Sequence, residues 1–218
     1  MSEKHGLIAF YGGTFDPIHY GHLRLVISLA KFIHFQRVVF LPNNIPTHRP
    51  IPVASAQQRL AMARLAISEL SNRSFDVDAR ELRYSTPSYT INTFEAIRKE
   101  YGPSAPLAFI IGQDSLLTLP RWYRGLELPI FCHLLMCARP GYSNWSDIRR
   151  YSFWFANRLT HDPQALYKKP AGLVYCATTM QLAISASNIR SRYRNGLACD
   201  GLLPSSVQGY IDQQGLYR

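Results

Sequence analysis

The sequence predicts an α/β fold, with a doubly wound parallel sheet and helices on both of its faces. Short apolar runs typical of buried strands alternate along the chain with longer amphipathic stretches typical of helices. Polar segments rich in glycine, proline or asparagine directly follow several of the apolar runs. Because the carboxyl ends of parallel strands share one edge of the sheet, we expect these segments to line one crevice.

The expected elements follow one another from the first strand onward. Residues 7–11 form an apolar run that indicates a buried strand, and the amphipathic stretch after it indicates a helix. The same reasoning gives strands at residues 7–11, 37–41, 75–79, 106–111, 131–138 and 173–177. It gives helices at about residues 18–33, 55–71, 88–101, 146–159, 187–195 and 205–214. Aromatic residues within 145–155 recur at helical spacing, so we expect them to form the core of a helical insertion.

The chain is expected to form a single domain. It has 218 residues, with no internal repeat, low-complexity tract or long linker, and it ends in a small helical part at about residues 185–218. No apolar run approaches the roughly 20 residues that span a bilayer, and the first residues lack a signal-peptide pattern. We therefore expect a cytoplasmic protein that does not bind membranes.

Composition narrows the class of partner. The net charge of +10 fits either a nucleic-acid surface or a field that gathers small polyanions. Because the basic residues are scattered, we favour small anions and expect no specific nucleic-acid partner. Cysteines occur at Cys132, Cys137, Cys176 and Cys199, none in a Cys-x-x-Cys pair, which indicates buried thiols and no zinc site.

The most distinctive segment is Gly-Gly-Thr-Phe-Asp-Pro-Ile-His-Tyr-Gly-His at residues 12–22, between the first strand and the first helix. Asp16 and Pro17 match a helix start, with a capping carboxylate followed by proline. His19 and His22 are three residues apart and share a helix face. Glycines allow a phosphate to approach the backbone, and imidazoles donate hydrogen bonds and can carry charge near neutral pH. The segment therefore predicts a phosphate site at a helix N-terminus.

A second candidate phosphate site is Ile-Ser-Ala-Ser-Asn-Ile-Arg at residues 184–190. Ser185 or Ser187 can cap the helix that follows, which would be a purely structural role. Arg190 lies three residues after Ser187, so a hydroxyl and a guanidinium share a helix face and can clamp phosphate oxygens.

These two segments resemble the H-x-G-H and Ile-Ser-Ser-Thr-x-Ile-Arg signatures of the nucleotidyltransferase superfamily, with Ala186 and Ser187 in place of a serine and a threonine. The rest of the chain is similar, in order, to the bacterial nicotinate-nucleotide adenylyltransferases. The segments that carry this similarity are Pro42-Asn43-Asn44, Pro46-Thr47-His48-Arg49, Pro87-Ser88-Tyr89-Thr90, Gly112-Gln113-Asp114-Ser115-Leu116, Trp122-Tyr123, Arg139-Pro140-Gly141 and residues 213–218.

The resemblance implies a Rossmann-like fold and adenylyl transfer from ATP to nicotinate mononucleotide, which yields deamido-NAD and pyrophosphate in NAD biosynthesis. It implies that the catalytic residues are His19, His22 and Arg190. It implies further ATP contacts from Gly12, Gly13, Thr14, Phe15, Ile184, Ser185 and Ser187. The implied contacts with the mononucleotide are Asn43, His48, Thr90, Gly112, Asp114, Trp122, Tyr123 and Arg139. Mg²⁺ is the expected cofactor, bound through the ATP phosphates and not by a dedicated protein site.

Residue type alone is also compatible with structural roles. Asp114 fits a helix cap, Trp122 a core anchor and Arg139 a surface cation at a strand end. The first motif also fits another small-molecule nucleotidyltransferase, such as a phosphopantetheine adenylyltransferase. The net charge also fits a non-catalytic nucleotide- or RNA-binding protein. We expect a monomer or a small homo-oligomer.

Overall fold

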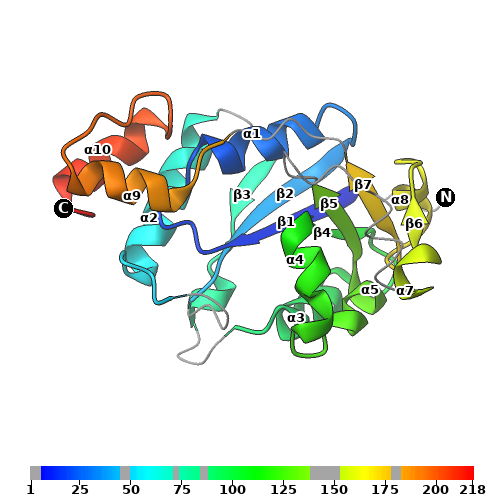
Figure 1. Cartoon of the computed structure of the whole chain (residues 1–218). Helices are drawn as coiled ribbons and strands as arrows, with labels where there is room; N and C mark the ends of the chain where they lie inside the picture. The colour runs from blue at the N-terminus through cyan, green and yellow to red at the C-terminus, as the bar shows by residue number, and fades with distance from the viewer. Residues whose placement is uncertain (1–5, 45–49, 71–73, 84–87, 138–152, 178–182) are drawn as a thin grey trace. The chain divides into compact units, whose positions relative to one another are not determined.

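Seven strands of the described residues form one sheet. A computed structural model describes residues 6–44, 50–70, 74–83, 88–137, 153–177 and 183–218. The strands are β1 (Leu7–Gly13), β2 (Phe35–Pro42), β3 (Phe75–Val77), β4 (Leu107–Gly112), β5 (His133–Cys137), β6 (Leu159–Thr160) and β7 (Val174–Ala177). Their order is β3-β2-β1-β4-β5-β7-β6 (Figure 1). β1 runs parallel to β4, β4 to β5, β5 to β7 and β7 to β6. The predicted parallel, doubly wound α/β sheet is confirmed, with its switch point between β1 and β4.

Helices lie between these strands and after the last of them. They are α1 (Tyr20–Leu29), α2 (Ala56–Glu69), α3 (Thr90–Tyr101), α4 (Gln113–Thr118), α5 (Leu128–Phe131), α7 (Phe153–Ala156), α8 (Ala165–Lys168), α9 (Ala186–Arg194) and α10 (Ser205–Gln213). Short 3-10 turns are η1 (Arg80–Arg83), η2 (Leu119–Arg121) and η3 (Gly125–Glu127). The chain divides into two compact units. Unit 1 consists of Met1–Tyr11, Ser28–Val38 and Tyr89–Met180, and unit 2 of Gly12–Ile27, Val39–Ser88 and Gln181–Arg218.

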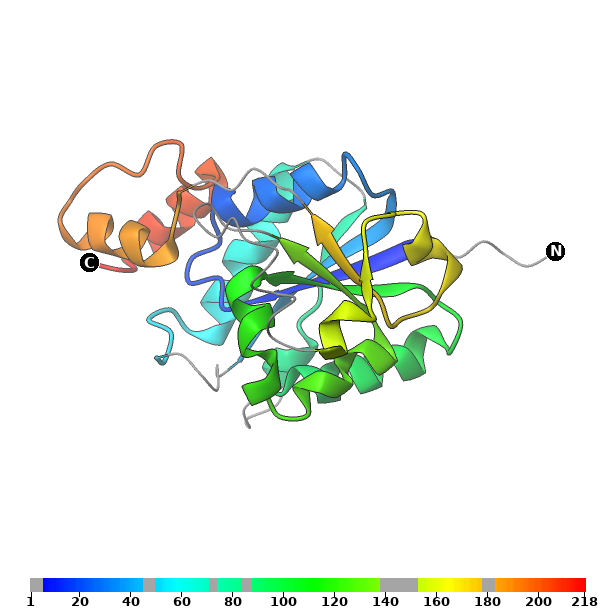
Figure 2. The same ribbon diagram turned by 45° about the vertical axis from the view of Figure 1, so that its right-hand side comes forward.

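Unit 1 is built around buried strands. β4 and β5 are buried along almost their whole length, as expected where helices cover both faces of a parallel sheet. Phe94 of α3 packs edge-on against Phe10 of β1 and Phe109 of β4, with ring centroids 5.7 and 5.2 Å apart. Arg98 of α3 donates through Nη2 to the main-chain oxygen of Phe131 at the end of α5, at 2.6 Å. Figures 1 and 2 show α3 and α5 along the same side of β4.

Unit 2 is held together by its helices. A capping box starts α2: Ser55 Oγ accepts from the Gln58 amide at 3.2 Å, and Gln58 Oε1 accepts from the Ser55 amide at 2.9 Å. The carboxylate of Glu69, at the other end of α2, accepts from the amide and the hydroxyl of Ser206 in the first turn of α10, at 3.1 and 2.7 Å. This carboxylate fixes α10 on α2 and complements the positive end of its helix dipole.

Most predicted elements are confirmed within a few residues, and the largest disagreement is at residues 146–159. Of the described part of that range, only Phe153–Ala156 is helical, and Leu159 belongs to β6. The main chain there pairs with β7, because the amide of Val174 donates to the Arg158 oxygen at 2.8 Å. All four cysteines are buried and none forms a disulfide, as predicted. Within the described part of the chain, no helix is long and apolar enough to cross a membrane.

Candidate active site

The glycine turn after β1 is shaped by one buried aromatic ring. Phe15 adopts φ of 50°, in the left-handed region, and its ring lies so close to Gly13 that a Cβ there would come within 2.6 Å of Phe15 Cε1. The ring meets the imidazole of His22 edge-on, with centroids 5.1 Å apart. Gly13 is therefore required by the packing of Phe15, and Phe15 in turn orients His22.

The two predicted histidines lie together. Their rings stack with centroids 3.8 Å apart, and His22 Nδ1 accepts from the main-chain amide of His19 at 3.3 Å. Because its Nδ1 is an acceptor, neutral His22 carries its proton on Nε2. His19 is only 4% exposed, and burial lowers its pKa to about 4. The predicted charge near neutral pH is thus wrong for His19, which is a neutral hydrogen-bonding group at pH 7.

His19 has an unsatisfied polar atom. Its Nδ1 is buried and has no hydrogen-bond partner among the residues that the structure describes. A Cβ at Gly21 would lie 2.8 Å from both Nδ1 and Cε1 of His19, and 3.1 Å from the main-chain oxygen of Ile184. Gly21 therefore leaves the space that the imidazole occupies. A buried polar atom without a partner costs free energy, which makes it a candidate ligand contact.

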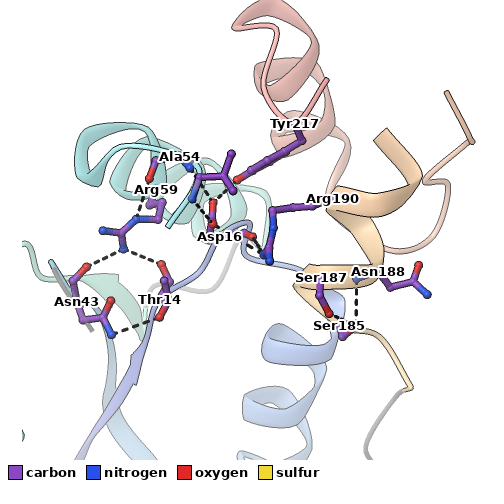
Figure 3. A network of polar contacts seen from close by, with 11 residues as sticks. Thr14, Asp16, Asn43, Ala54, Arg59, Ser185, Ser187, Asn188, Arg190 and Tyr217 are labelled. Carbon is purple, nitrogen blue, oxygen red and sulfur yellow. Dashed lines mark hydrogen bonds and ion pairs between the residues drawn. The ribbon is translucent and has the colours of Figure 1, made fainter. Parts of the chain in front are cut away.

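Asp16 joins the first motif to the second. The carboxylate of Asp16 is 5% exposed and accepts from the amides of Val53 and Ala54, at 2.8 and 3.1 Å. The predicted capping of α1 by Asp16 is therefore wrong, since α1 begins at Tyr20 and this carboxylate serves the chain before α2. Arg190 Nη1 donates to the main-chain oxygen of Asp16 at 2.7 Å and lies 3.8 Å from its Oδ2 (Figure 3). The two predicted phosphate motifs thus meet at Asp16.

A buried arginine organises the neighbouring loops. Arg59 of α2 is 1% exposed, and Nη1 donates to the main-chain oxygens of Thr14 and Asn43 at 2.7 and 2.6 Å. Its Nη2 donates to the oxygen of Asn44 at 2.8 Å. Asn43 Nδ2 also donates to Thr14 Oγ1 at 3.4 Å (Figure 3). The segments after β1 and β2 are therefore fixed to one guanidinium. Sequence analysis missed Arg59 because an arginine in an amphipathic helix normally faces solvent.

The second motif opens α9. Ser185 caps the helix by accepting from the Asn188 amide at 3.3 Å, and its Oγ lies 3.2 Å from Ser187 Oγ. A pocket of about 230 Å³ lies at this helix start. It is lined by Ala183, Ile184, Ser185, Asn188, Arg192, Asp200 and Leu202. The capping role considered for Ser185 is confirmed, and Ile184 and Ser185 also face a space that can hold a ligand.

The residues predicted to contact the mononucleotide fall in both units. Asn43 lies in unit 2, whereas Thr90, Gly112, Asp114, Trp122 and Tyr123 lie in unit 1. Thr90 is the first residue of α3, and Asp114 is in the first turn of α4. A Cβ at Gly112 would lie 2.7 Å from Asp114 Oδ1, so a larger residue there would displace the Asp114 carboxylate. Trp122 is half-buried just after η2, whereas His48 and Arg139 lie outside the described residues.

One aromatic neighbour was not predicted. Tyr89, which precedes α3, lies with its ring centroid 4.8 Å from that of Tyr123, and both rings are exposed. The pair brings the Thr90 end of α3 next to the turn that follows Trp122. The only sequence signal for this pair was that each tyrosine is next to a predicted contact residue: Tyr89 precedes Thr90, and Tyr123 follows Trp122.

The described residues contain no group of three or more histidine, cysteine, aspartate or glutamate side chains that could hold a metal ion. The nearest carboxylate to the histidines in sequence, that of Asp16, is already engaged by two main-chain amides and the Tyr217 hydroxyl.

Comparison with known proteins identifies the family. A family model described as cytidylyltransferase-like matches residues 10–192. The chain is 71% identical over 218 residues, with 100% of both chains covered, to the "Probable nicotinate-nucleotide adenylyltransferase" of Sodalis glossinidius (strain morsitans). It is 56% identical over 215 residues, with 99% of both covered, to the protein of the same name from Baumannia cicadellinicola subsp. Homalodisca coagulata.

A solved structure shares the fold. "Plasmodium falciparum nicotinic acid mononucleotide adenylyltransferase complexed with NaAD" matches with a TM-score of 0.72 at 18% identity, over 98% of both chains. The fold, the full-length identity to these relatives and the matched family model agree. The chain belongs to the cytidylyltransferase-like family and, within it, to the nicotinate-nucleotide adenylyltransferases.

Proposed function

We propose that the protein transfers the adenylyl group of ATP to nicotinate mononucleotide and releases deamido-NAD and pyrophosphate. The observation that carries this proposal is the buried Nδ1 of His19 in the H-x-G-H turn, which has no hydrogen-bond partner among the described residues. The second motif is joined to this turn at Asp16, whose main-chain oxygen accepts from Arg190. The names of the full-length relatives at 71% and 56% identity support the choice of substrates.

The reaction needs no general base. The mononucleotide phosphate is already ionised, so it attacks the α-phosphorus of ATP directly, and the bond to the bridging oxygen of pyrophosphate breaks. The work of the protein is then positioning and charge stabilisation. A neutral His19 fits this work, because it donates a hydrogen bond to a phosphate oxygen and is not required to remove a proton. His22, with Nδ1 already accepting, donates through Nε2.

The remaining ATP contacts are assigned within unit 2. Main-chain donors of Gly12, Gly13 and Thr14, beside Phe15, approach the phosphates. Ser187 and Arg190 stabilise the departing pyrophosphate, since a guanidinium forms charge-assisted hydrogen bonds with phosphate oxygens. The pocket at Ile184 and Ser185 receives the adenine. ATP enters as its magnesium complex, with Mg²⁺ on the phosphate oxygens and water as its further ligands.

The mononucleotide contacts are assigned residue by residue. Asp114 accepts hydrogen bonds from the ribose, and Trp122 stacks on the pyridine ring. Thr90 and the main chain of Tyr123 donate to the ring carboxylate, which an amide would satisfy less well. We further assign contacts to Asn43, His48, Gly112 and Arg139. That the chain is one domain working in the cytoplasm, as a monomer or small homo-oligomer, remains a prediction.

A pyrophosphate-release assay tests the function. Purified protein with MgATP is given nicotinate mononucleotide, nicotinamide mononucleotide or phosphopantetheine. We expect release with nicotinate mononucleotide at the highest kcat/KM, and none after Mg²⁺ is chelated. His19→Ala should lower kcat by about 10²–10³, the usual cost of losing one transition-state donor. His34→Ala is the matched control, because His34 is exposed and its described contacts use only main-chain atoms.

The outcomes separate the alternatives. Preferred turnover of phosphopantetheine would identify a different small-molecule adenylyltransferase. RNA binding that persists at high salt, without turnover of ATP, would favour a non-catalytic binding protein, because phosphate-driven binding weakens steeply with salt. Near-normal kcat of His19→Ala would show that the role assigned to this imidazole is wrong.

A further inference from the structure

We propose that Tyr217 is a positioning residue for adenylyl transfer: through the Asp16 carboxylate, it holds Arg190 where the triphosphate of ATP is bound. The inference rests on the proposed function, in which Arg190 binds the departing pyrophosphate. Tyr217 lies 27 residues after Arg190 in the sequence and follows α10, so neither motif includes it.

Tyr217 donates the shortest hydrogen bond that the Asp16 carboxylate receives. Its hydroxyl lies 2.7 Å from Asp16 Oδ1, compared with 2.8 and 3.1 Å for the amides of Val53 and Ala54. Among the described residues, Arg190 also faces the carboxylate, 3.8 Å from Oδ2. Figure 3 shows Arg190 approaching Asp16 from α9 and Tyr217 approaching it from the end of the chain after α10. The orientation of the carboxylate toward Arg190 therefore depends on the donors that hold it.

Tyr217 can act only as a donor in this bond. It is 5% exposed, and burial together with the hydrogen bond to Asp16 raises the pKa of its hydroxyl well above the ordinary value. The phenol therefore keeps its proton throughout the working pH range and donates it to Asp16 Oδ1. A permanent donor at 2.7 Å holds the carboxylate in one orientation.

The main chain at Tyr217 is also held in an uncommon conformation. Its φ is 66°, in the left-handed region that a residue with a large side chain rarely adopts. Such conformations persist where surrounding contacts over-determine them, and they concentrate at functional sites. Here the buried ring and the bond to Asp16 supply those contacts.

The contact with Asp16 fixes one end of the Arg190 side chain. This side chain is 25% exposed, and Nη1 is the atom that donates to the main-chain oxygen of Asp16, at 2.7 Å. A guanidinium has five N–H donors, so a bond through Nη1 leaves donors for a phosphate ligand. Fixing one end of a flexible side chain before the ligand arrives reduces the entropy lost on binding. Asp16 and Tyr217 thus preorganise Arg190 without touching the ligand.

A double-mutant cycle tests this coupling. Tyr217→Phe removes only the hydroxyl, and we expect kcat/KM for ATP to fall about tenfold, the scale of one hydrogen bond to a charged group. The KM for nicotinate mononucleotide should change by less than about twofold, because unit 1 supplies most of its contacts. In an Arg190→Ala background, the same Tyr217→Phe change should have almost no further effect. An equal loss in both backgrounds would refute the positioning role.

Tyr193→Phe is the matched control. The Tyr193 ring lies 6.2 Å from that of Tyr217, and its hydroxyl is buried with no partner among the described residues. Removing this hydroxyl should leave kcat/KM for ATP unchanged in both backgrounds. A loss equal to that of Tyr217→Phe would attribute the effect to general packing and overturn the inference.

A measurement on the unmutated protein covers the case in which Tyr217→Phe does not fold. Nuclear magnetic relaxation of arginine Nε–Hε groups should show Arg190 as rigid as the buried Arg59. The exposed Arg64 on the same helix as Arg59 should be mobile. Mobility of Arg190 equal to that of Arg64 would refute the inference.

Failure of the proposed function can be distinguished from failure of the positioning role. Affinity for a non-hydrolysable ATP analogue, measured by calorimetry through the same cycle, does not require the acceptor. If the unmutated protein made no dinucleotide but the cycle in ATP affinity showed the coupling, the function would be wrong and the positioning role would stand. Turnover without coupling in either measurement would support the proposed function and refute the positioning role of Tyr217.

Discussion

Acidification should destabilise the folded protein through His19. Burial holds the pKa of His19 at about 4 in the folded state, against an ordinary value of 6.5 in the unfolded chain. Between these values the unfolded state binds a proton that the folded state rejects. The free energy of unfolding therefore falls as the pH is lowered from 6.5 toward 4. At 1.36 kcal/mol per pKa unit, the loss attributable to this one imidazole amounts to about 3 kcal/mol. Above pH 6.5 His19 is neutral in both states and contributes no pH dependence.

Urea unfolding at pH 7.5, 6.5, 5.5 and 4.5 measures this loss. The same series on His19→Gln provides the reference, because glutamine does not titrate. The difference between the two proteins isolates His19, since His133, whose pKa is also lowered by burial, is present in both. We expect the His19→Gln protein to gain about 2–3 kcal/mol relative to the unmutated protein between pH 6.5 and 4.5. A difference that stays constant across this range would refute the assignment of a buried neutral His19.

Other substitutions test the geometry of the site. Gly21→Ala should lower kcat by about 10²-fold, because the new Cβ displaces the His19 imidazole, and it is measured by pyrophosphate release. Arg59→Met should lower the free energy of unfolding by about 3 kcal/mol in urea titrations, because several partly buried main-chain oxygens lose their donor. Trp122→Ala should raise KM for nicotinate mononucleotide far more than KM for ATP, as steady-state kinetics with each substrate varied would show.

Each of these variants has a matched control. Gly209→Ala, in α10, meets no atom within 4 Å and should stabilise the protein slightly by raising helix propensity. Arg64→Met, at an exposed position of α2, should change stability by less than about 0.5 kcal/mol. Trp154→Ala removes the tryptophan of α7 and should not change the KM for one substrate more than the KM for the other. A normal kcat for Gly21→Ala, full stability of Arg59→Met, or equal shifts of both KM values for Trp122→Ala would contradict the corresponding assignment.

Local patterns in the sequence were enough to predict the framework. The apolar run at residues 7–11 predicted β1, because a strand buried on both faces needs no polar alternation. The three-residue spacing of His19 and His22 predicted neighbouring rings, and Ser185 was correctly considered as a helix cap. The two-residue strand β6 was missed, because so short an element is defined by its pairing with β7 and carries no periodicity of its own.

Whatever depends on residues distant in the sequence was decided by the tertiary structure. Asp16 and Pro17 carry a helix-start pattern, but the carboxylate is taken by amides 37 and 38 residues away and by Tyr217. Arg59 lies in an amphipathic helix where an arginine is expected at the surface, yet it is buried and donates to main-chain oxygens of the neighbouring loops. The residue types and spacing alone predicted that His19 and His22 lie together at one site. The charge of His19 was set by burial, because desolvation penalises the protonated ring and only the folded chain removes it from water.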